Sequence, residues 1–373
     1  MLRVFGAPQR IVTSSQTPRR QAEPLGCDIV RNATVPPSIC HDIRPYDEAE
    51  PHLFRGWKAG VYDTDGLVCE SSLMDRHWTR VSVPYEPHEI RACETIHMSG
   101  EAVFCGLLFH HFGHFLLEST NRLWWPLMED FGGWFVFQNT RPGKDVPDFA
   151  TRFFRLIGIE DRVRVVETPL SFDRVIVPHR ALVIQKSIHS HCRVPFLKAG
   201  QAAERHVRPS RAFARDAAGL YVSRTHFLKR RSFGERRLER AFLDEGYQIV
   251  HMEEHPLEQQ ILAVRNTMTI AGVAGSAFHS ILFSDARKQC VYICKDYNIN
   301  SNFFMVDEVM NNDSVYVYNN RESETSLELS HSELLDRYLD DAELNLLKMY
   351  KYLELSGVLK GRPNGGASRR SAG

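Results

Sequence analysis

The stretch YQIVHMEEHPLEQQILAVRNTMTIAG, residues 247–272, decides the fold of the second half of the chain. It opens with a β-rich run at 247–251, continues with apolar residues at helical spacing within 257–266, and closes with a second run at 268–272 that ends in glycine. A strand, a helix of about ten residues and another strand form a β-α-β unit with parallel strands and a right-handed connection. The stretch therefore predicts a parallel sheet covered by helices.

The same alternation continues on both sides of this unit. GLYVS at 219–223 is strand-like, and ERRLERAFLDEG at 235–246 has apolar residues at helical spacing before Gly246, a typical helix stop. SAFHSILFSD at 276–285 predicts a short helix, and CVYIC at 290–294 predicts a fourth strand. We therefore expect an α/β domain of the Rossmann-like type here.

The first half of the chain alternates less regularly. A helical pattern covers 148–158, and a charged segment rich in small residues, 205–219, is the expected linker between the halves. Four runs are strand-like: 101–106, 133–138, 162–167 and 174–178. These patterns predict a second α/β domain.

The domain prediction that follows has five parts. They are a loosely ordered segment 1–50, a first α/β domain 51–205, a Rossmann-like domain 206–329, a helical stretch 330–356 and a disordered tail 357–373. Ser330 and Glu333 have the spacing of a capping box and mark the expected start of the helical stretch.

Composition limits the possible functions. The 373 residues suit two domains, and 46 Lys+Arg against 46 Asp+Glu give no net charge that would favour nucleic acid. We find no run of about 18 apolar residues, no signal-peptide h-region and no C-x-x-C pair among the eight cysteines. The sequence predicts a cytoplasmic protein with reduced thiols and no transmembrane segment, at most associated peripherally with the inner membrane face.

A glycine loop and several arginines are candidates for binding phosphate. Gly272 and Gly275 lie between a predicted strand and helix, and Ser276 is placed as the helix N-cap. Such a loop offers backbone N–H groups and the positive end of a helix dipole. Arg224 and Arg231 follow the first strand of the same domain, and guanidinium groups bind phosphate through paired hydrogen bonds.

Plainer interpretations of these residues exist. Glycines at such turns often serve geometry alone, and the arginines could form a solvated basic helix start. The spacing does not match G-x-G-x-x-G, which argues against NAD. If Gly275 is needed for binding, we expect its role to be a positive φ or a close backbone approach that a β-branched residue would block.

An apolar segment, GLLFHHFGHFLLESTNRLWWPL at 106–127, carries His110, His111, His114 and Glu118. In a helix starting near His111, the last three would share one face. A glutamate in such surroundings has a raised pKa unless it is paired, which would suit proton transfer. Two alternatives stay open, namely a His–Glu pair that only holds the core together and a metal site with two nitrogen ligands and one oxygen ligand.

Three pieces of the chain together resemble glycosyltransferase family 61. FHHFGHFLLESTNRLW is similar to the family's "NYGHFLLE" followed by "LPRLW". YVSRTHFLKRRSFGERRLERAFLDEGYQIV resembles "YISR…RRIxNExEL…LxxxGFxIV", and PLEQQILAVRNTMTIAGVAGSAFHSILF resembles "SxxEQxxLFxxAxxIxGxHGAGLxNxLF". The chain departs from these patterns by Gly234 for Asn, Gln259 for Glu and Ala274 for His, and by His279 and Ser280 in place of another polar pair.

The resemblance implies a GT-B architecture, in which two Rossmann-like domains face each other across a cleft. It implies an inverting transferase that moves a sugar from a nucleotide-sugar, most often a UDP-sugar, to a glycan hydroxyl, without a required cofactor. The first domain would then be the acceptor side and the second the donor side. Catalytic candidates are Glu118, His114 and His111, and donor-binding candidates are Arg224, Arg231, Glu235, Gly272, Gly275, Ser276 and His279.

Bacterial members of the family are associated with capsular and other surface polysaccharides, an analogy that extends to this chain only as an expectation. DTD at 63–65 reads as a turn, so no D-x-D metal motif is expected. Two rival functions are a non-catalytic sugar- or nucleotide-binding protein with a GT-B shell and a metal-dependent hydrolase using the histidines.

Overall fold

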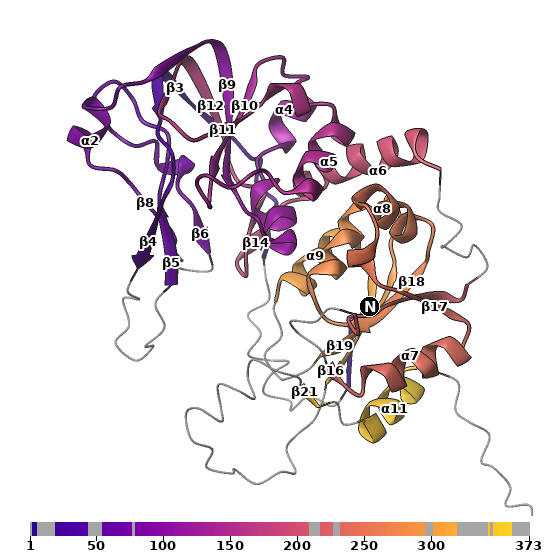
Figure 1. The fold of residues 1–373 in the computed structure, drawn as a ribbon. Coiled ribbons are helices and arrows are strands. Elements are labelled where there is room, and N and C mark those ends of the chain that lie inside the picture. Colours follow the sequence, from indigo (N-terminus) through magenta and orange to yellow (C-terminus); the bar gives the residue numbers. More distant parts are fainter. Residues whose placement is uncertain are drawn as a thin grey trace, which may run out of the picture.

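The computed structural model describes most of the chain as two α/β domains joined side by side (Figure 1). The described residues are 2–5, 19–43, 54–76, 79–208, 217–226, 232–294, 301–318, 342–343 and 346–359. Each domain has its own sheet with parallel strands, in agreement with the expected GT-B arrangement.

The C-terminal domain contains a six-stranded sheet in which all neighbouring strands are parallel. In sheet order the strands are β1 (Leu2–Phe5), β20 (Asp313–Tyr318), β19 (Gln289–Cys294), β18 (Thr269–Val273), β15 (Gly219–Val222) and β17 (Tyr247–Val250). The chain runs outward from β15 to β17 and then crosses back to β18 on the other side of β15. This reversal is a topological switch point, where open sheets form a crevice at the carboxyl ends of their strands.

The strands and helices predicted for this domain between residues 219 and 294 are confirmed, with one change of helix type. The helices are α7 (Glu235–Asp244), α8 (Leu257–Arg265), η6 (Ser276–Phe283) and α9 (Asn302–Met310). η6 is a 3₁₀-helix and its N-cap is Gly275, so the prediction of Ser276 as N-cap is wrong. The sequence patterns also missed α9 and β20, which Asp307 ties together by accepting hydrogen bonds from the hydroxyls of Tyr292 (2.9 Å) and Tyr316 (2.7 Å).

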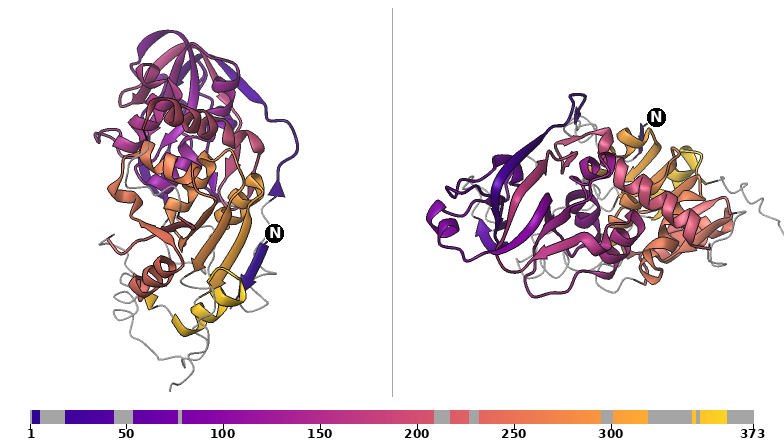
Figure 2. Two further views of the ribbon diagram at one scale, coloured as in Figure 1. Left: turned by 90° about the vertical axis from the view of Figure 1, so that its right-hand side faces the viewer. Right: turned by 90° about the horizontal axis from the view of Figure 1, so that it is seen from above.

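The edge strand β1 comes from the very start of the chain and pairs with β20, more than 300 residues away, as Figure 2 shows at the N label. Cys27–Val35 form β3 in the other large sheet. The prediction of a loosely ordered segment 1–50 is therefore wrong for these two strands, whose pairing partners are too distant in sequence to leave a local pattern.

The N-terminal domain contains a five-stranded sheet. In sheet order its strands are β11 (Val163–Val166), β10 (Trp134–Asn139), β9 (Ile96–Leu108), β12 (Leu170–Pro178) and the antiparallel β3. All four strands predicted for this half are confirmed, and the other four strands of this sheet run parallel. Its helical segments are α2 (Pro87–Arg91), α3 (Phe112–His114), η2 (Phe115–Ser119), α4 (Trp124–Met128), α5 (Asp148–Ile157) and α6 (Val194–His206), with short 3₁₀ turns η1 (Glu70–Ser72), η3 (Glu160–Arg162) and η4 (Ser190–Arg193).

Small sheets complete the described structure. A wing beside the N-terminal sheet consists of β4 (Ile39–Ile43), β5 (Phe54–Lys58) and β8 (Ser82–Val83) with the hairpin β6 (Asp75–Arg76) and β7 (Thr79–Arg80). The remaining elements are β2 (Arg19–Arg20), β13 (Leu182–Val183), β14 (Ser187–Ile188), β16 (Ser232–Phe233), β21 (Ala342–Glu343), η5 (Met252–Glu254) and α11 (Leu346–Leu355). The predicted turn at 63–65 is confirmed, since Asp63 Oδ1 accepts the backbone N–H groups of Asp65 and Leu67.

The two domains share one hydrophobic core. Side chains of the N-terminal domain such as Phe115 and Phe153 belong to the same buried cluster as Ile261 and Phe283 of the C-terminal domain. α6 packs on α5 and also on α8 and η6, so this helix bridges the domains. A continuous core fixes the relative position of the two sheets and hence the shape of the space between them.

Arg265 reinforces the bridge between the domains. Its side chain, 2% exposed, pairs with Glu204 of α6 and with Asp285, and it donates a hydrogen bond to the Phe283 carbonyl. Gly200 of α6 makes room for it, because a Cβ there would lie 2.6 Å from the guanidinium. The ion pairs therefore connect α6 of one domain to α8 and to the segment after η6 of the other.

Some expectations fall outside the described residues. These are parts of the linker 205–219, Ser330 and Glu333, and the tail from residue 360 on; α11 lies within the predicted helical stretch 330–356. All eight cysteines are free thiols. Within the described ranges, no helix combines the length and apolar character needed to cross a membrane.

Candidate active site

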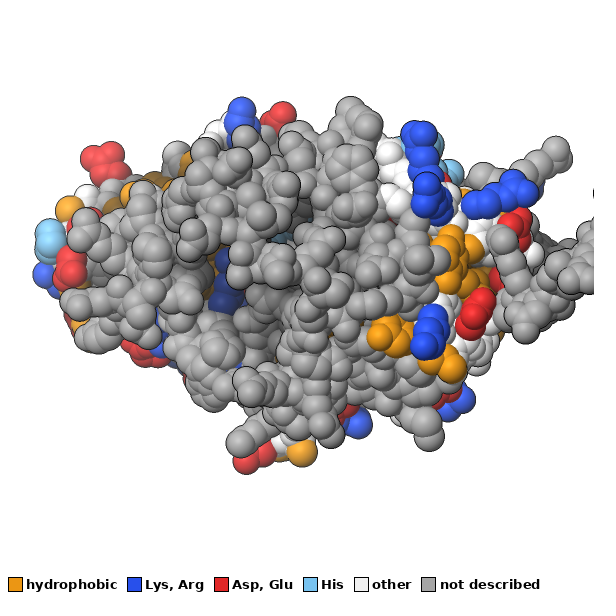
Figure 3. Space-filling view, turned by 90° about the horizontal axis from the view of Figure 1, so that it is seen from below, with side chains coloured by type: hydrophobic (Ala, Val, Ile, Leu, Met, Phe, Trp, Pro, Cys, Tyr) orange, Lys and Arg blue, Asp and Glu red, His pale blue; other side chains and the backbone are white. Residues whose placement is uncertain are grey.

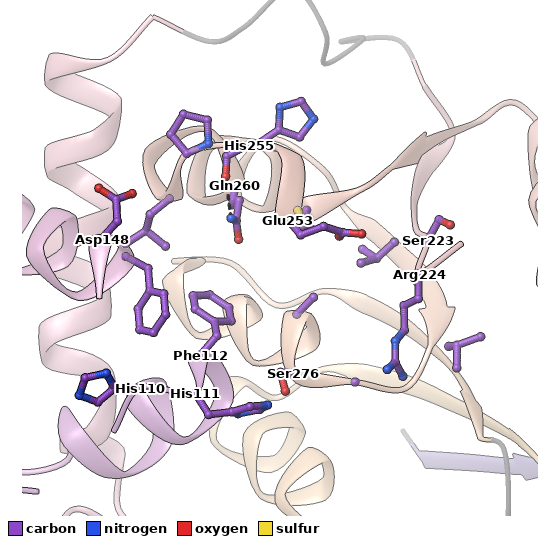
Figure 4. Close-up of a pocket in the computed structure, with 18 residues that line it drawn as sticks. His110, His111, Phe112, Asp148, Ser223, Arg224, Glu253, His255, Gln260 and Ser276 are labelled. Carbon is purple, nitrogen blue, oxygen red and sulfur yellow. Dashed lines mark hydrogen bonds between the residues drawn. The ribbon is translucent and has the colours of Figure 1, made fainter. Parts of the chain in front are cut away.

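A cavity of about 610 Å³ lies between the two domains (Figure 4). Its C-terminal wall follows the carboxyl ends of β15, β17 and β18, the position expected for a ligand at the switch point. Its N-terminal wall comes from the start of α3 and of α5. The lining residues with polar side chains are His110, His111, Asp148, Ser223, Arg224, Glu253, His255, Gln260 and Ser276. Four residues predicted from the sequence therefore line it: His111, Arg224, Gly275 and Ser276.

Arg224 projects into the cavity toward the glycine loop (Figure 4). Its guanidinium Nη1 lies 3.4 Å from the Ala274 carbonyl, and a Cβ on Gly275 would lie 3.3 Å from the same nitrogen. The missing side chain at Gly275 thus lets the guanidinium pack flat against the loop. This places a positive charge beside the N-terminus of η6, a suitable arrangement for a phosphate group.

Glu235, predicted as a donor-binding residue, has a supporting position. It is fully buried at the start of α7, and its Oε1 accepts the backbone N–H of Arg224 at 2.9 Å. The carboxylate fixes the loop that carries Arg224 and does not line the cavity. Arg231, the other predicted arginine, lies outside the described residues.

The two loop glycines are needed for different reasons. Gly272 has φ of 152°, and a Cβ there would lie 2.4 Å from the Val222 carbonyl of the neighbouring strand, so this glycine allows β18 to approach β15. It does not line the cavity. Gly275 has φ of −172°, an extended conformation open to any residue, so the expectation of a positive φ at Gly275 is wrong and only the close approach remains.

The two walls touch at Gly113. A Cβ on Gly113 would lie 2.8 Å from Ser276 Oγ and 3.4 Å from the His279 ring, so only glycine lets α3 pack directly on η6. His111 points toward Ser276 across this contact (Figure 4). The predicted catalytic segment and the glycine loop are therefore neighbours in space.

Behind His111 lies a buried ion cluster. His114 Nδ1 is 2.6 Å from Glu118 Oε2, and Arg76 donates to both carboxylate oxygens, with Nε at 2.7 Å from Oε1 and Nη2 at 2.8 Å from Oε2. The Glu118 side chain is 3% exposed, whereas that of His114 is 41% exposed. The rings of His111 and His114 meet edge to face at 5.2 Å. The structure thus brings all three predicted catalytic residues together and adds Arg76.

The backbone that arranges this cluster differs from the expected regular helix. α3 has only three residues and continues into η2, a π-helical turn over Phe115–Ser119. π-turns are rare and frequently occur at functional sites. Thr120 Oγ1 donates to the Leu116 carbonyl at 2.6 Å, which satisfies part of the irregular backbone. His111 caps the start, so it does not share a helical face with Glu118.

Glu118 is paired and ionised. Burial would raise the pKa of the Glu118 carboxyl, but the hydrogen bond from His114 and the charge and hydrogen bonds of Arg76 outweigh burial and hold the pKa below its usual value. Both oxygens are occupied, so the expectation that Glu118 takes up the acceptor proton does not fit this geometry. A carboxylate only accepts hydrogen bonds, so the short contact places a proton on His114 Nδ1; in a neutral imidazole the lone pair is then on Nε2.

The metal alternative does not fit these residues either. The oxygens of Glu118 already bind Arg76 and His114. Across the described ranges, no group of three or more His, Cys, Asp or Glu side chains is arranged to hold a metal ion.

His279, predicted for donor binding, is buried behind the cavity wall. Its ring stacks on Phe303 at 5.0 Å, and its Nδ1 has no hydrogen-bond partner among the described residues. Burial, together with the nearby His114 and His111, lowers the pKa of His279 from 6.5 to about 3. The imidazole is therefore neutral and packs the contact between the domains.

We expect His279→Phe to make stability less dependent on pH. In the unfolded wild-type chain His279 takes up a proton below pH 6.5, whereas in the folded protein it does so only below about pH 3. The free energy of unfolding therefore falls as pH falls through this window. Phenylalanine removes this contribution, up to about 1.4 kcal/mol for each pH unit. Urea unfolding at pH 7, 6, 5 and 4 measures it, with His206→Gln on the exposed face of α6 as control. Equal pH slopes for wild-type and His279→Phe proteins would contradict the assignment.

Sequence reasoning missed several lining residues. Asp148 starts α5, Ser223 precedes Arg224, and Glu253 and His255 follow β17. Their positions at strand and helix ends were the available signal, because ligands gather there in α/β folds. Gln260 lay within a quoted motif, PLEQQ, and its side chain is held by a hydrogen bond to the His255 carbonyl at 2.8 Å.

Comparison with known proteins gives the family. Residues 112–293 match the family model described as Glycosyltransferase 61. No curated protein matches the chain. The matched range contains His114, Glu118, Arg224 and Ser276, and it omits His110, His111 and Arg76. Residues 112–293 thus form a glycosyltransferase family 61 domain, and the chain that carries it is a glycosyltransferase.

Proposed function

We propose that the protein transfers a sugar, with inversion, from a nucleotide-sugar, most simply a UDP-sugar, to a hydroxyl of a glycan acceptor. The observation that carries this proposal is the cavity itself. One of its walls offers Arg224 and the start of η6, and the opposite wall offers His111 with the His114–Glu118 pair behind it. A donor diphosphate and an acceptor hydroxyl need these two kinds of group on opposite sides of the reacting carbon.

The donor diphosphate would bind at Arg224, Gly275 and Ser276. Negative charge grows on the diphosphate as the bond to the sugar breaks, and fixed positive groups that are already in place stabilise it without reorganisation. Arg224 is held at its backbone by Glu235 and at its guanidinium by the loop, so its charge is fixed in direction. No bound metal is needed for this role of the chain's own residues.

The acceptor hydroxyl would lose its proton to His114. The oxygen attacks the anomeric carbon from the face opposite the diphosphate, the new C–O bond forms as the old one breaks, and the proton moves to Nε2. Glu118 holds the proton on Nδ1 and stabilises the imidazolium that results. His111, on the cavity wall, would contact the reacting groups between His114 and Ser276.

The acceptor would be a growing surface polysaccharide made at the inner membrane face, where a cytoplasmic enzyme meets both substrates. The support is the family analogy alone. Incubation with UDP-sugars and an oligosaccharide library tests the activity, with nucleoside diphosphate release and product anomer read by NMR. Retention of configuration, or no release from any nucleotide-sugar, would overturn the proposal.

We expect Arg224→Met to weaken UDP binding by about 1.5–3 kcal/mol, the usual worth of a hydrogen bond to a charged group. Methionine keeps the volume of the arginine stem but removes the charge beside Gly275. Isothermal titration calorimetry measures the change, and Arg240→Met is the matched control, because Arg240 is 73% exposed on α7. Equal UDP affinity of folded Arg224→Met and wild-type protein would remove Arg224 from the donor site.

A further inference from the structure

Arg76 belongs to the wing of the N-terminal domain and lies outside the family match. It reaches the buried Glu118 carboxylate with two parallel hydrogen bonds, and its Nη2 is 3.5 Å from His114 Nδ1. Such paired contacts fix both distance and orientation of a carboxylate. The side chain of Arg76 is 27% exposed, so the arginine closes the cluster toward solvent.

Two aromatic rings lie next to the Arg76 guanidinium. Its Cζ lies 5.2 Å from the centre of the Phe109 ring and 5.8 Å from that of Trp57, and these two rings contact each other edge to face. Cation–π contacts favour a charged guanidinium over ring faces. The guanidinium is therefore restricted before any substrate binds.

The hairpin that carries Arg76 is anchored to the sheet. Arg180, which follows β12, donates to the Asp75 carbonyl at 2.9 Å and to its carboxylate at 2.8 Å. Arg80 pairs with the same carboxylate at 3.2 Å. The Met74 carbonyl accepts the backbone N–H of Val81 at 2.9 Å. These contacts make the hairpin a rigid support and not a loose loop over the site.

We propose that Arg76 is a positioning residue for glycosyl transfer: it locks Glu118, which in turn holds His114 with Nε2 available to the acceptor hydroxyl. This inference rests on the proposed function of His114 as the base. The wing would thus supply a part of the active site that the family domain lacks on its own.

The physical reason is the number of donors that Glu118 requires. A buried carboxylate with a single partner has unused lone pairs and can rotate, whereas three donors leave one orientation. Without Arg76, the Glu118 charge would act on His114 alone and favour its imidazolium form. Among the described residues, the charged or titratable groups that face His114 are Arg76, Glu118, His111 and His279.

Arg76→Met in the full-length protein tests the inference. We expect UDP affinity to stay as in wild type, kcat to fall about 10–100-fold at neutral pH, and the acidic limb of the pH–kcat profile to move upward by about 1–2 units. Arg76→Lys keeps the charge without the paired contact and should recover part of the rate. Arg155→Met on α5, which removes an exposed ion pair with Glu160 of the same domain, is the matched control and should keep wild-type values.

A double-mutant cycle separates this inference from the proposed function. If Arg76 acts through His114, Arg76→Met has no further effect on kcat in a His114→Gln background. If the fold-changes in kcat of Arg76→Met and His114→Gln multiply in the double variant, the positioning role is overturned while His114 stays the base. An unchanged pH profile of Arg76→Met would have the same consequence. A wild-type rate for His114→Gln alone would instead overturn the proposed base. If Arg76→Met does not fold, Arg76→Lys provides the same comparison.

Discussion

Replacing His114 with glutamine should lower kcat by about 10²–10⁴-fold while UDP binds as in wild-type protein, because general-base catalysis is usually worth that much. Nδ1 of His114 donates to Glu118 at 2.6 Å, so in the neutral imidazole Nε2 is the nitrogen that can accept a proton. Glutamine can still donate to Glu118, so the buried carboxylate keeps a partner. The loss should therefore fall on turnover and leave the donor wall unchanged.

Steady-state kinetics with calorimetric UDP titration measures both quantities for His114→Gln. His111→Gln is the comparison of choice, because His111 lines the cavity and its ring lies 5.2 Å from that of His114. We expect His111→Gln to lower donor affinity more than kcat. If His111→Gln lost turnover and His114→Gln did not, the base would be His111.

Glu118→Gln should reduce both stability and turnover, and the loss of stability is the part that the sequence alone did not predict. The amide of glutamine would face Arg76 Nη2 or His114 Nδ1 with a donor in place of an acceptor, and the Arg76 charge would lose its partner. We expect the free energy of unfolding to fall by about 2–3 kcal/mol, less than for a fully buried pair because Arg76 is 27% exposed. Turnover should fall about 10²–10⁴-fold because the imidazole loses its fixed tautomer.

Urea unfolding and steady-state kinetics measure these changes. Glu160→Gln is the control, because its ion pair with Arg155 is largely exposed and its loss should change stability little. In wild-type protein the pKa of Glu118 is lowered, so its contribution to stability is complete above its ordinary value of 4.5 and is lost as pH falls below it. A Glu118→Gln protein with wild-type stability and rate would show that the cluster is not important.

The sequence predicted the parallel sheets well because each β-α-β unit is a local pattern. The runs at 247–251 and 268–272 became β17 and β18, and the helical pattern at 257–266 became α8. β1 could not be predicted in the same way, because its pairing with β20 depends on residues at opposite ends of the chain. Contacts over such distances leave no periodicity within a window of the sequence.

The candidate site was predicted in its residue types and only partly in its geometry. His114 and Glu118 were expected together and lie 2.6 Å apart, but Glu118 has a second partner that holds it ionised, Arg76, 42 positions earlier. The pKa of a buried carboxyl depends on such neighbours, so its direction could not be read from an apolar helix pattern. The glycine loop was placed correctly, whereas the strand packing at Gly272 and the arginine contact at Gly275 required coordinates.

Exposed side chains of several types lie together on one face of the protein. On the face seen from below, hydrophobic, basic and acidic side chains intermingle among the coloured, described residues of the C-terminal domain (Figure 3). Such mixing is ordinary for a protein surface.

A crystal structure with the nucleoside diphosphate that binds most tightly, chosen by calorimetry among UDP, GDP, ADP and dTDP, tests the central claim most directly. The account predicts the diphosphate in the cavity between the domains, within hydrogen-bond distance of the Arg224 guanidinium and the backbone N–H of Ser276. It also predicts that the β-phosphate faces His111 and His114. A diphosphate bound elsewhere, or in the cavity without contact to Arg224 and Ser276, would contradict it.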